Sequence, residues 1–211
     1  MMNLFFVRHA ESVSNAKSKD KYGKGDQLTP LGQTQANDLS VELAKHSYDQ
    51  IYVSPSLRTI QTVAPYLRSS GKQATLLPIC AEAPGPSIAR VFESLLGSRS
   101  KKHKSKSVEI LPEHADLLVP HPRFTDPPVR HESLKDGIKR TELLALYLVE
   151  TYGKSDLSVL LVSHGQMGRQ IISILSRSVV PHPDNAQLWK LSGTGCPFYL
   201  ERVNGRNLTR S

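Results

Sequence analysis

The feature that most constrains this chain is a short apolar run near its start that breaks abruptly into two polar residues. Residues 4–7 are apolar, and Arg8 and His9 follow at once. A run of β-branched and aromatic residues this short favours a buried strand over a helix. Arg8 and His9 would then lie at the C-terminal end of the strand, where open α/β sheets bind ligands. By itself, the same pattern also fits a strand end with solvated side chains.

A second expected strand ends in the same way. Residues 158–162 form an apolar run that suits a central strand buried on both faces, and Ser163 and His164 follow it. Arg58 lies early in the helix expected after a third strand, over residues 50–53. Three such positions at one sheet edge indicate a functional site more strongly than any one of them does.

Helix and strand signals alternate along the chain. Thr29 with Pro30 and Ser54 with Pro55 each join a capping hydroxyl to a proline at the first helical position, and Pro65 should kink or shorten the second of these helices. The further strands and helices are expected over residues 74–79, 87–96, 136–152, 165–175, 187–191 and 198–201. This alternation predicts an α/β fold, with a mostly parallel central sheet and helices on both faces.

The length of 211 residues suits one sizeable domain, so we expect a single domain over residues 1–211. Regularity fades between about residues 84 and 135, where prolines are frequent and a basic run covers residues 99–106. Long irregular segments in compact domains are usually functional lids or disordered. We therefore expect a lid-like insertion over about residues 84–135 that covers the active-site edge.

Composition narrows the class of protein. The net charge of +8 suggests anionic ligands. Cys80 and Cys196 give neither a disulfide framework nor a metal-ligand spacing. The opening apolar run stops at Arg8, too early for a signal peptide or a membrane span. We expect a cytoplasmic protein without a membrane partner.

The side chains expected at the sheet edge suit the transfer of a phosphoryl group. A phosphate monoester is close to a dianion near neutral pH, and Arg8 and Arg58 can each offer it two hydrogen bonds. Helix N-termini after the strands would add backbone N–H groups. One neutral imidazole can attack phosphorus in line, and a second beside it can donate to a phosphoryl oxygen.

Five segments, in the right order, resemble the histidine phosphatase superfamily. VRHAESVSN resembles its Arg-His-Gly signature, and SHGQ resembles its second His-Gly motif. DQLTPLGQTQA, SPSLRTIQTV and HESLKDGIKR are similar to three further segments of the family. The match runs from residue 4 to about residue 176. Ala10 replaces the signature glycine, and His131 replaces the glycine before Glu132.

The resemblance implies a role for each matched position. His9 would be the phosphorylated nucleophile, and Arg8, Arg58 and His164 would complete the phosphate pocket. Glu82, just after the strand expected over residues 74–79, falls where the family keeps its proton donor.

The resemblance also implies two contacts with the substrate. Asn15 would donate to a phosphate oxygen, and Gln166 would reach the substrate through its side chain or its backbone. Glu132 is the alternative candidate for the general acid. Glu132 could instead be a structural hydrogen-bond acceptor. No metal and no cofactor is expected.

Within the superfamily, the second His-Gly motif indicates the phosphoglycerate-mutase-like branch. The chain has no good match to the arginine-rich segment of the mutases, so a phosphatase is favoured over a mutase. The substrate would be a small phosphate ester or a phosphopeptide. The sequence does not indicate an oligomeric state.

Two other classes of protein stay open. One is a phosphatase-like binding module whose basic run contacts a partner. Nucleic acid is not the expected partner, because no aromatic residues interleave with the lysines. The other is a metal-dependent phosphatase, although no histidine pair has ligand spacing with a carboxylate partner.

Overall fold

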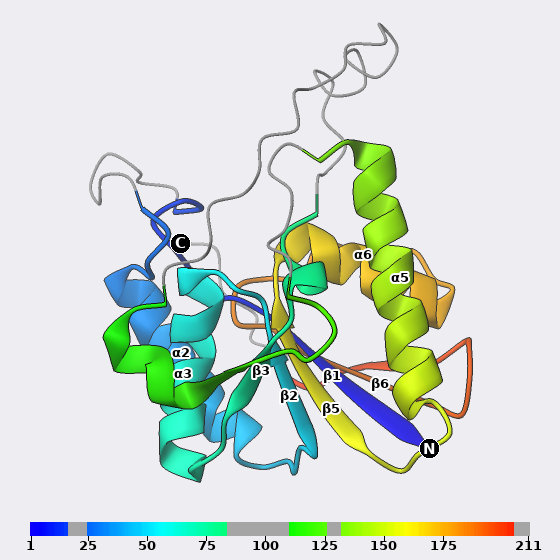
Figure 1. Ribbon diagram of the computed structural model, residues 1–211, viewed down its shortest axis with the longest axis horizontal. Helices are drawn as coiled ribbons and strands as arrows, with labels where there is room; N and C mark the ends of the chain where they lie inside the picture. The colour runs from blue at the N-terminus through cyan, green and yellow to red at the C-terminus, as the bar shows by residue number, and fades with distance from the viewer. Residues whose placement is uncertain (17–24, 84–109, 126–131, 205–211) are drawn as a thin grey trace, which may run out of the picture.

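The computed structural model describes residues 1–16, 25–83, 110–125 and 132–204 (Figure 1). These residues form a seven-stranded sheet with the strand order β4-β3-β2-β5-β1-β6-β7. The strands are β1 (Met2–Arg8), β2 (Gln50–Val53), β3 (Ala74–Leu76), β4 (Leu118–Pro120), β5 (Ser158–Ser163), β6 (Leu188–Gly193) and β7 (Tyr199–Arg202).

Strands β4, β3, β2, β5 and β1 are parallel to one another. Strand β6 pairs with β1 in the antiparallel direction, and β7 pairs with β6 in the antiparallel direction. The predicted mostly parallel α/β fold is therefore confirmed. β1 pairs with β5 so that Arg8 lies opposite Ser163, and β2 pairs with β5 so that Val53 lies opposite Val162. The residues that follow these three strands consequently meet at one edge of the sheet.

Helices cover both faces of the sheet, as predicted. They are α2 (Pro30–Leu43), α3 (Leu57–Ser70), α5 (Leu134–Tyr152) and α6 (Gly165–Ser176), with the short 3-10 helices η1 (Pro78–Cys80) and η2 (Pro112–Leu117). Figure 1 shows α2 and α3 on one face and α5 and α6 on the other. Successive side chains of β1 therefore pack on opposite faces of the sheet. Leu4 and Phe6 pack with α5 and α6, and Phe5 and Val7 pack with α2 and α3.

The start of α2 confirms its predicted cap. The Thr29 side chain accepts a hydrogen bond from the Gly32 N–H at 3.0 Å, and Pro30 is the first helical residue. A Cβ on Gly32 would overlap the Glu11 carbonyl, so this glycine lets α2 approach the loop after β1.

Two details predicted for α3 are wrong. The helix begins at Leu57 after Ser56, because the Ser54 N–H still donates to Val162 on β5 and so extends the sheet. The helix also continues through Pro65 to Ser70, so this proline does not shorten it, and the kink stays a prediction. Burial of neighbouring side chains, Ala64 and Tyr66 among them, offsets the hydrogen bond that proline removes.

The expected strand over residues 74–79 ends at Leu76, because Pro78 begins η1. Part of the expected insertion is regular: residues 110–125 contribute η2 and β4, and β4 extends the sheet beside β3. Burial of Leu117 and Leu118 explains why this proline-bearing segment packs as a strand. The expected helix over residues 87–96 and the basic run over residues 99–106 lie outside the described residues, and the lid-like role stays a prediction.

Candidate active site

His9 lies directly after β1 and is 3% exposed. Its Nδ1 is 2.7 Å from the Ala10 carbonyl oxygen, which can only accept, so Nδ1 carries the proton and Nε2 presents a lone pair. Burial, together with the positive charge of Arg58, lowers the pKa of His9 to about 3. The ring is therefore a neutral imidazole near pH 7, which is the form a nucleophile needs.

His164 follows β5, with its ring centroid 5.4 Å from that of His9. Its Nδ1 accepts from Arg58 Nε at 3.2 Å and from Arg58 Nη2 at 2.9 Å. Since Nδ1 accepts, the proton is on Nε2, which donates to Ser54 Oγ at 2.7 Å. Burial and the Arg58 charge lower the pKa of His164 well below its ordinary value. In this arrangement both ring nitrogens contact the protein, and the ring holds the guanidinium in place.

Arg58 lies in the first turn of α3 and has a second partner, Asp26. Arg58 Nη1 forms an ion pair with an Asp26 carboxylate oxygen, and the Arg58 backbone N–H donates to the other oxygen at 3.4 Å. The guanidinium contacts to Asp26 and His164 use three of its five N–H groups, and the other two have no partner within the described residues and could bind a phosphate. Asp26 was not predicted as a site residue, although it opens the DQLT segment of the family resemblance.

Arg8 ends β1, and its Nη1 donates to the Pro183 carbonyl at 2.8 Å and lies 3.5 Å from Nδ1 of His182. Its Nε is buried and has no hydrogen-bond partner in the described part of the chain. Burial lowers the pKa of this guanidinium, and the carboxylates of Glu82 and Asp184 raise it. A buried donor without a partner is costly, so an anion at this position would be stabilising.

Glu82 follows η1, and its Oε1 accepts hydrogen bonds from three backbone N–H groups. They belong to Ala83 at 3.1 Å, Gln166 at 3.2 Å and Met167 at 3.3 Å. A carboxylate at the N-terminus of α6 is favoured by the helix dipole. Within the described residues Oε2 has no hydrogen-bond partner, so it is the oxygen free to carry a proton.

The loop after β1 is held by a pair of amides. Asn15 Oδ1 accepts from the N–H and the Oγ of Ser12, both at 2.7 Å, and its Nδ2 donates to Asn185 Oδ1 at 3.1 Å. Asn185 Nδ2 in turn donates to the His9 carbonyl at 2.8 Å. The second Nδ2 N–H of Asn15 has no partner in the described part of the chain, and its contact with a phosphate remains a prediction. Sequence reasoning missed Asn185, because the short polar stretch between Pro183 and β6 carries no distinctive pattern.

Other positions clarify the departures from the family motifs. Ala10 is buried and is not among the residues with positive φ, so this position does not require the signature glycine. A Cβ on Gly165 would overlap the ring of His182, which explains the glycine after His164. Glu132 forms an ion pair with Arg140, which supports its reading as a structural acceptor.

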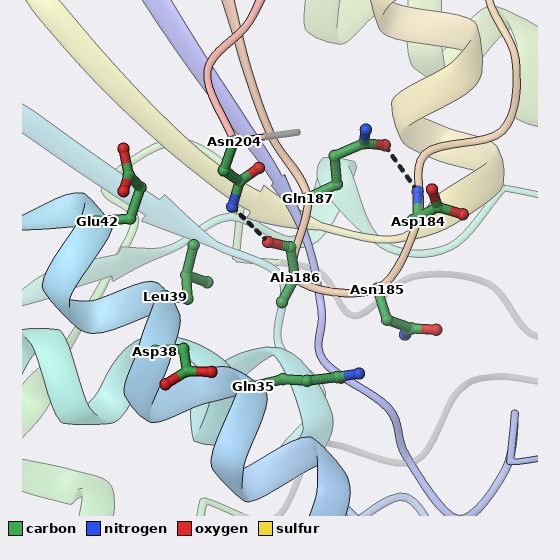
Figure 2. Close-up of a pocket in the computed structure, with 9 residues that line it drawn as sticks. All are labelled: Gln35, Asp38, Leu39, Glu42, Asp184, Asn185, Ala186, Gln187 and Asn204. Atoms are coloured by element: carbon green, nitrogen blue, oxygen red, sulfur yellow. Dashed lines mark hydrogen bonds between the residues drawn. The ribbon is translucent and has the colours of Figure 1, made fainter. Parts of the chain in front are cut away.

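A cavity of about 130 Å³ lies between α2 and the segment before β6 (Figure 2). Its lining residues are Gln35, Asp38, Leu39, Glu42, Asp184, Asn185, Ala186, Gln187 and Asn204. Figure 2 shows Asn204 donating to the Ala186 carbonyl, at 3.1 Å, and Gln187 accepting from the Asp184 N–H, at 2.8 Å. None of the predicted site residues lines this cavity.

Comparison with known proteins now identifies the family. The family model described as "Histidine phosphatase superfamily (branch 1)" matches residues 4–205. This chain belongs to the histidine phosphatase superfamily. Members of the superfamily work in general through a phosphohistidine, so the chain is a metal-independent phosphoric monoester hydrolase.

Several of the similar proteins carry phosphatase names. A protein of Hydrogenobacter thermophilus, provisionally named phosphoserine phosphatase 2, is 27% identical over 214 residues, which is 97% of this chain and 96% of the relative. An ecdysone phosphate phosphatase from Bombyx mori superposes with a TM-score of 0.60 at 16% identity, covering 100% of this chain and 96% of that one. A phosphoserine phosphatase from Entamoeba histolytica gives a TM-score of 0.57 at 19% identity, covering 91% of each chain. These two structures share the fold of this histidine phosphatase.

The structure brings His9, Arg8, Arg58 and His164 to one sheet edge, with Glu82 at the start of α6. Gln166 contacts the site through its backbone N–H, which donates a hydrogen bond to Glu82. In the described part of the chain, no three His, Cys, Asp or Glu side chains are grouped so that they could hold a metal ion. No helix over the same residues is long and apolar enough to span a membrane.

Proposed function

We propose that this histidine phosphatase uses His9 Nε2 as its nucleophile. The observation that carries the proposal is the hydrogen bond from Nδ1 to the Ala10 carbonyl, which leaves a neutral ring with its Nε2 lone pair free. In the first step a bond forms between Nε2 and phosphorus as the bond to the ester oxygen breaks. In the second step water attacks the phosphohistidine and releases inorganic phosphate.

Arg8 and Arg58 would bind the phosphoryl oxygens. Arg8 has a buried Nε without a partner among the described residues, and Arg58 retains two N–H groups. Both are positive charges close enough to His9 to depress its pKa. Donors fixed in advance stabilise the charge on the equatorial oxygens in the transition state. His164 would support this contact by orienting Arg58.

Glu82 would be the general acid. The departing alkoxide needs a proton as its bond breaks, and Glu82 can supply one from Oε2 while Oε1 stays bound to α6. The resulting carboxylate can then take a proton from the water that attacks the phosphohistidine. Glu132 fits this role less well, because its carboxylate is already paired with Arg140.

Trapping of the phosphoenzyme tests the proposal. Mixing with phosphate ester labelled in its phosphoryl group, followed by quenching without acid, should give an acid-labile phosphoprotein. His9→Ala should give neither labelled protein nor turnover, while His46→Ala, which changes a histidine in the turn after α2, should retain both. Labelling of His9→Ala to the wild-type level would contradict the assignment.

The names of the relatives suggest the first substrate to test. Phosphoserine names two of the similar proteins, so phosphoserine and small phosphopeptides that contain it belong in the first set of assays. We propose hydrolysis over phosphoryl transfer between metabolites, since the chain lacks a good match to the arginine-rich segment of the mutases. Phosphate release that equals substrate loss would support this, whereas a phosphorylated acceptor would indicate a mutase. We also propose that the protein is cytoplasmic and that nucleic acid is not its partner.

A further inference from the structure

Four consecutive backbone carbonyls that lead to Glu82 are held by two side chains. Arg140 donates from Nη1 to Ile79 at 2.8 Å and to Ala81 at 2.9 Å, and from Nη2 to Glu82 at 3.0 Å. Ser163 Oγ donates to the remaining carbonyl, that of Cys80, at 2.5 Å. The backbone of residues 79–82 is therefore fixed between α5 and the end of β5.

The charge of Arg140 is balanced at the same place. Glu132 accepts from Arg140 Nε at 2.9 Å and from Nη2 at 2.7 Å, and both side chains are only 13% exposed. Removing one member of a buried ion pair leaves an unpaired charge. A lysine could not replace the arginine fully, because it lacks the planar fork that reaches three carbonyls and a carboxylate together.

The side chain of Glu82 is held from the opposite side. Its Oε1 accepts from the Gln166 and Met167 N–H groups at the start of α6, and Oε2 has no hydrogen-bond partner among the described residues. We propose that Arg140, neutralised by Glu132, is the positioning residue for the general acid Glu82. The inference rests on the proposed function, in which Glu82 protonates the leaving group.

This role predicts a selective kinetic effect. General acid catalysis needs the proton within hydrogen-bond reach of the leaving oxygen, and a small displacement of the acid weakens it. An alkyl phosphate expels a poor leaving group and depends on this proton, whereas nitrophenyl phosphate expels a stable anion and does not. An arginine that only stabilised the fold would lower both activities equally.

The experiment compares the ratio of kcat/KM for an alkyl phosphate to kcat/KM for nitrophenyl phosphate. This ratio does not depend on the fraction of protein that is folded. Arg140→Met should lower it about tenfold or more, and Arg140→Lys should lower it less. Arg68→Met is the matched control: Arg68 also donates to a backbone carbonyl, but that of Glu113 in η2. It should leave the ratio unchanged.

Glu82→Gln separates the two hypotheses. If it lowers the ratio about 100-fold while Arg140→Met and Arg140→Lys leave the ratio at the wild-type value, Glu82 is the acid and the positioning role is wrong. If Glu82→Gln itself leaves the ratio unchanged, the proposed acid is wrong. In the double variant of Glu82→Gln and Arg140→Met, the ratio should match that of Glu82→Gln alone, because the arginine acts through the carboxyl. If the Arg140→Met variant does not fold, the kcat/KM ratio of Arg140→Lys is the test. A ratio for Arg140→Lys equal to that of the wild type overturns the inference.

Discussion

The Arg58 guanidinium donates two hydrogen bonds to a single nitrogen of His164, from Nε at 3.2 Å and from Nη2 at 2.9 Å. Ser54 occupies the other ring nitrogen, which fixes the tautomer as well as the orientation of the ring. The second histidine of the family signature therefore sets the position of the arginine that would bind phosphate. We therefore expect His164 to contribute to catalysis by positioning Arg58.

We expect His164→Asn to lower kcat/KM by about 100-fold or more, because Arg58 loses an acceptor that holds it in the site. The inhibition constant for inorganic phosphate should rise in the same variant, since phosphate binding depends on the same guanidinium. Steady-state kinetics with phosphate as a competitive inhibitor measure both effects. A large loss of turnover with unchanged phosphate affinity would show that His164 acts on the substrate by another route.

Asp26 should weaken the binding of anions through its charge. Asp26→Asn keeps the shape of the side chain but removes a negative charge paired with Arg58. Because Asp26 is partly exposed, we expect phosphate to bind only about two- to fivefold more tightly. Asp49→Asn is the control, since Asp49 accepts from the Ser158 N–H at the start of β5. Weaker phosphate binding in Asp26→Asn would show that the carboxylate mainly orients Arg58.

Asn185 should affect activity separately from stability. Asn185→Ala removes the hydrogen bonds to the His9 carbonyl and to Asn15, so we expect kcat/KM to fall about tenfold and the free energy of unfolding to fall by about 1–2 kcal/mol. Asn204→Ala is the matched control, because Asn204 bonds the backbone of Ala186 and Leu188 and does not contact His9. It should lose similar stability with little loss of activity. Equal losses of activity in both variants would contradict a specific role for Asn185.

The buried histidines should make stability fall in acid. Burial lowers the pKa of His9 to about 3 and that of His164 well below its ordinary value, whereas both take up a proton near pH 6.5 in the unfolded chain. Below about pH 6.5 the unfolded state therefore binds more protons, and the free energy of unfolding decreases as pH falls. Each histidine contributes up to about 1.4 kcal/mol per pH unit. Urea unfolding between about pH 7.5 and pH 5 should show a shallower dependence for His9→Asn, and an unchanged slope would contradict this account.

Removal of divalent metal should leave turnover unchanged. Arg8 and Arg58 already supply the positive charge that a metal would bring to a phosphoryl group. We expect full activity after exhaustive dialysis against EDTA, measured on nitrophenyl phosphate in buffers treated to remove metal. Loss of turnover that a divalent ion restores would overturn this prediction.

The central part of the site could be predicted from the sequence. Apolar runs that end in His9 and His164 mark strand ends, and the cap before α2 marks a helix start, because these signals depend on neighbouring residues. Parallel strands then bring their C-terminal ends together, which places Arg58 at the same edge. The mostly parallel sheet and the helices on both faces followed from the same local patterns.

The contacts that orient these groups become visible only in the folded chain. The tautomers of His9 and His164, the pairing of Arg58 with Asp26, and the amide of Asn185 on the His9 carbonyl depend on atoms far apart in the sequence. β4 is only three residues long, and it forms because it pairs with β3 and because Leu117 and Leu118 are buried. No local sequence pattern reveals these contacts. The residues that reach the sheet edge could be identified from the amino-acid sequence, since strand and helix signals are local. Which atom of each residue is free to react was decided by long-range hydrogen bonds, which exist only once the chain is folded.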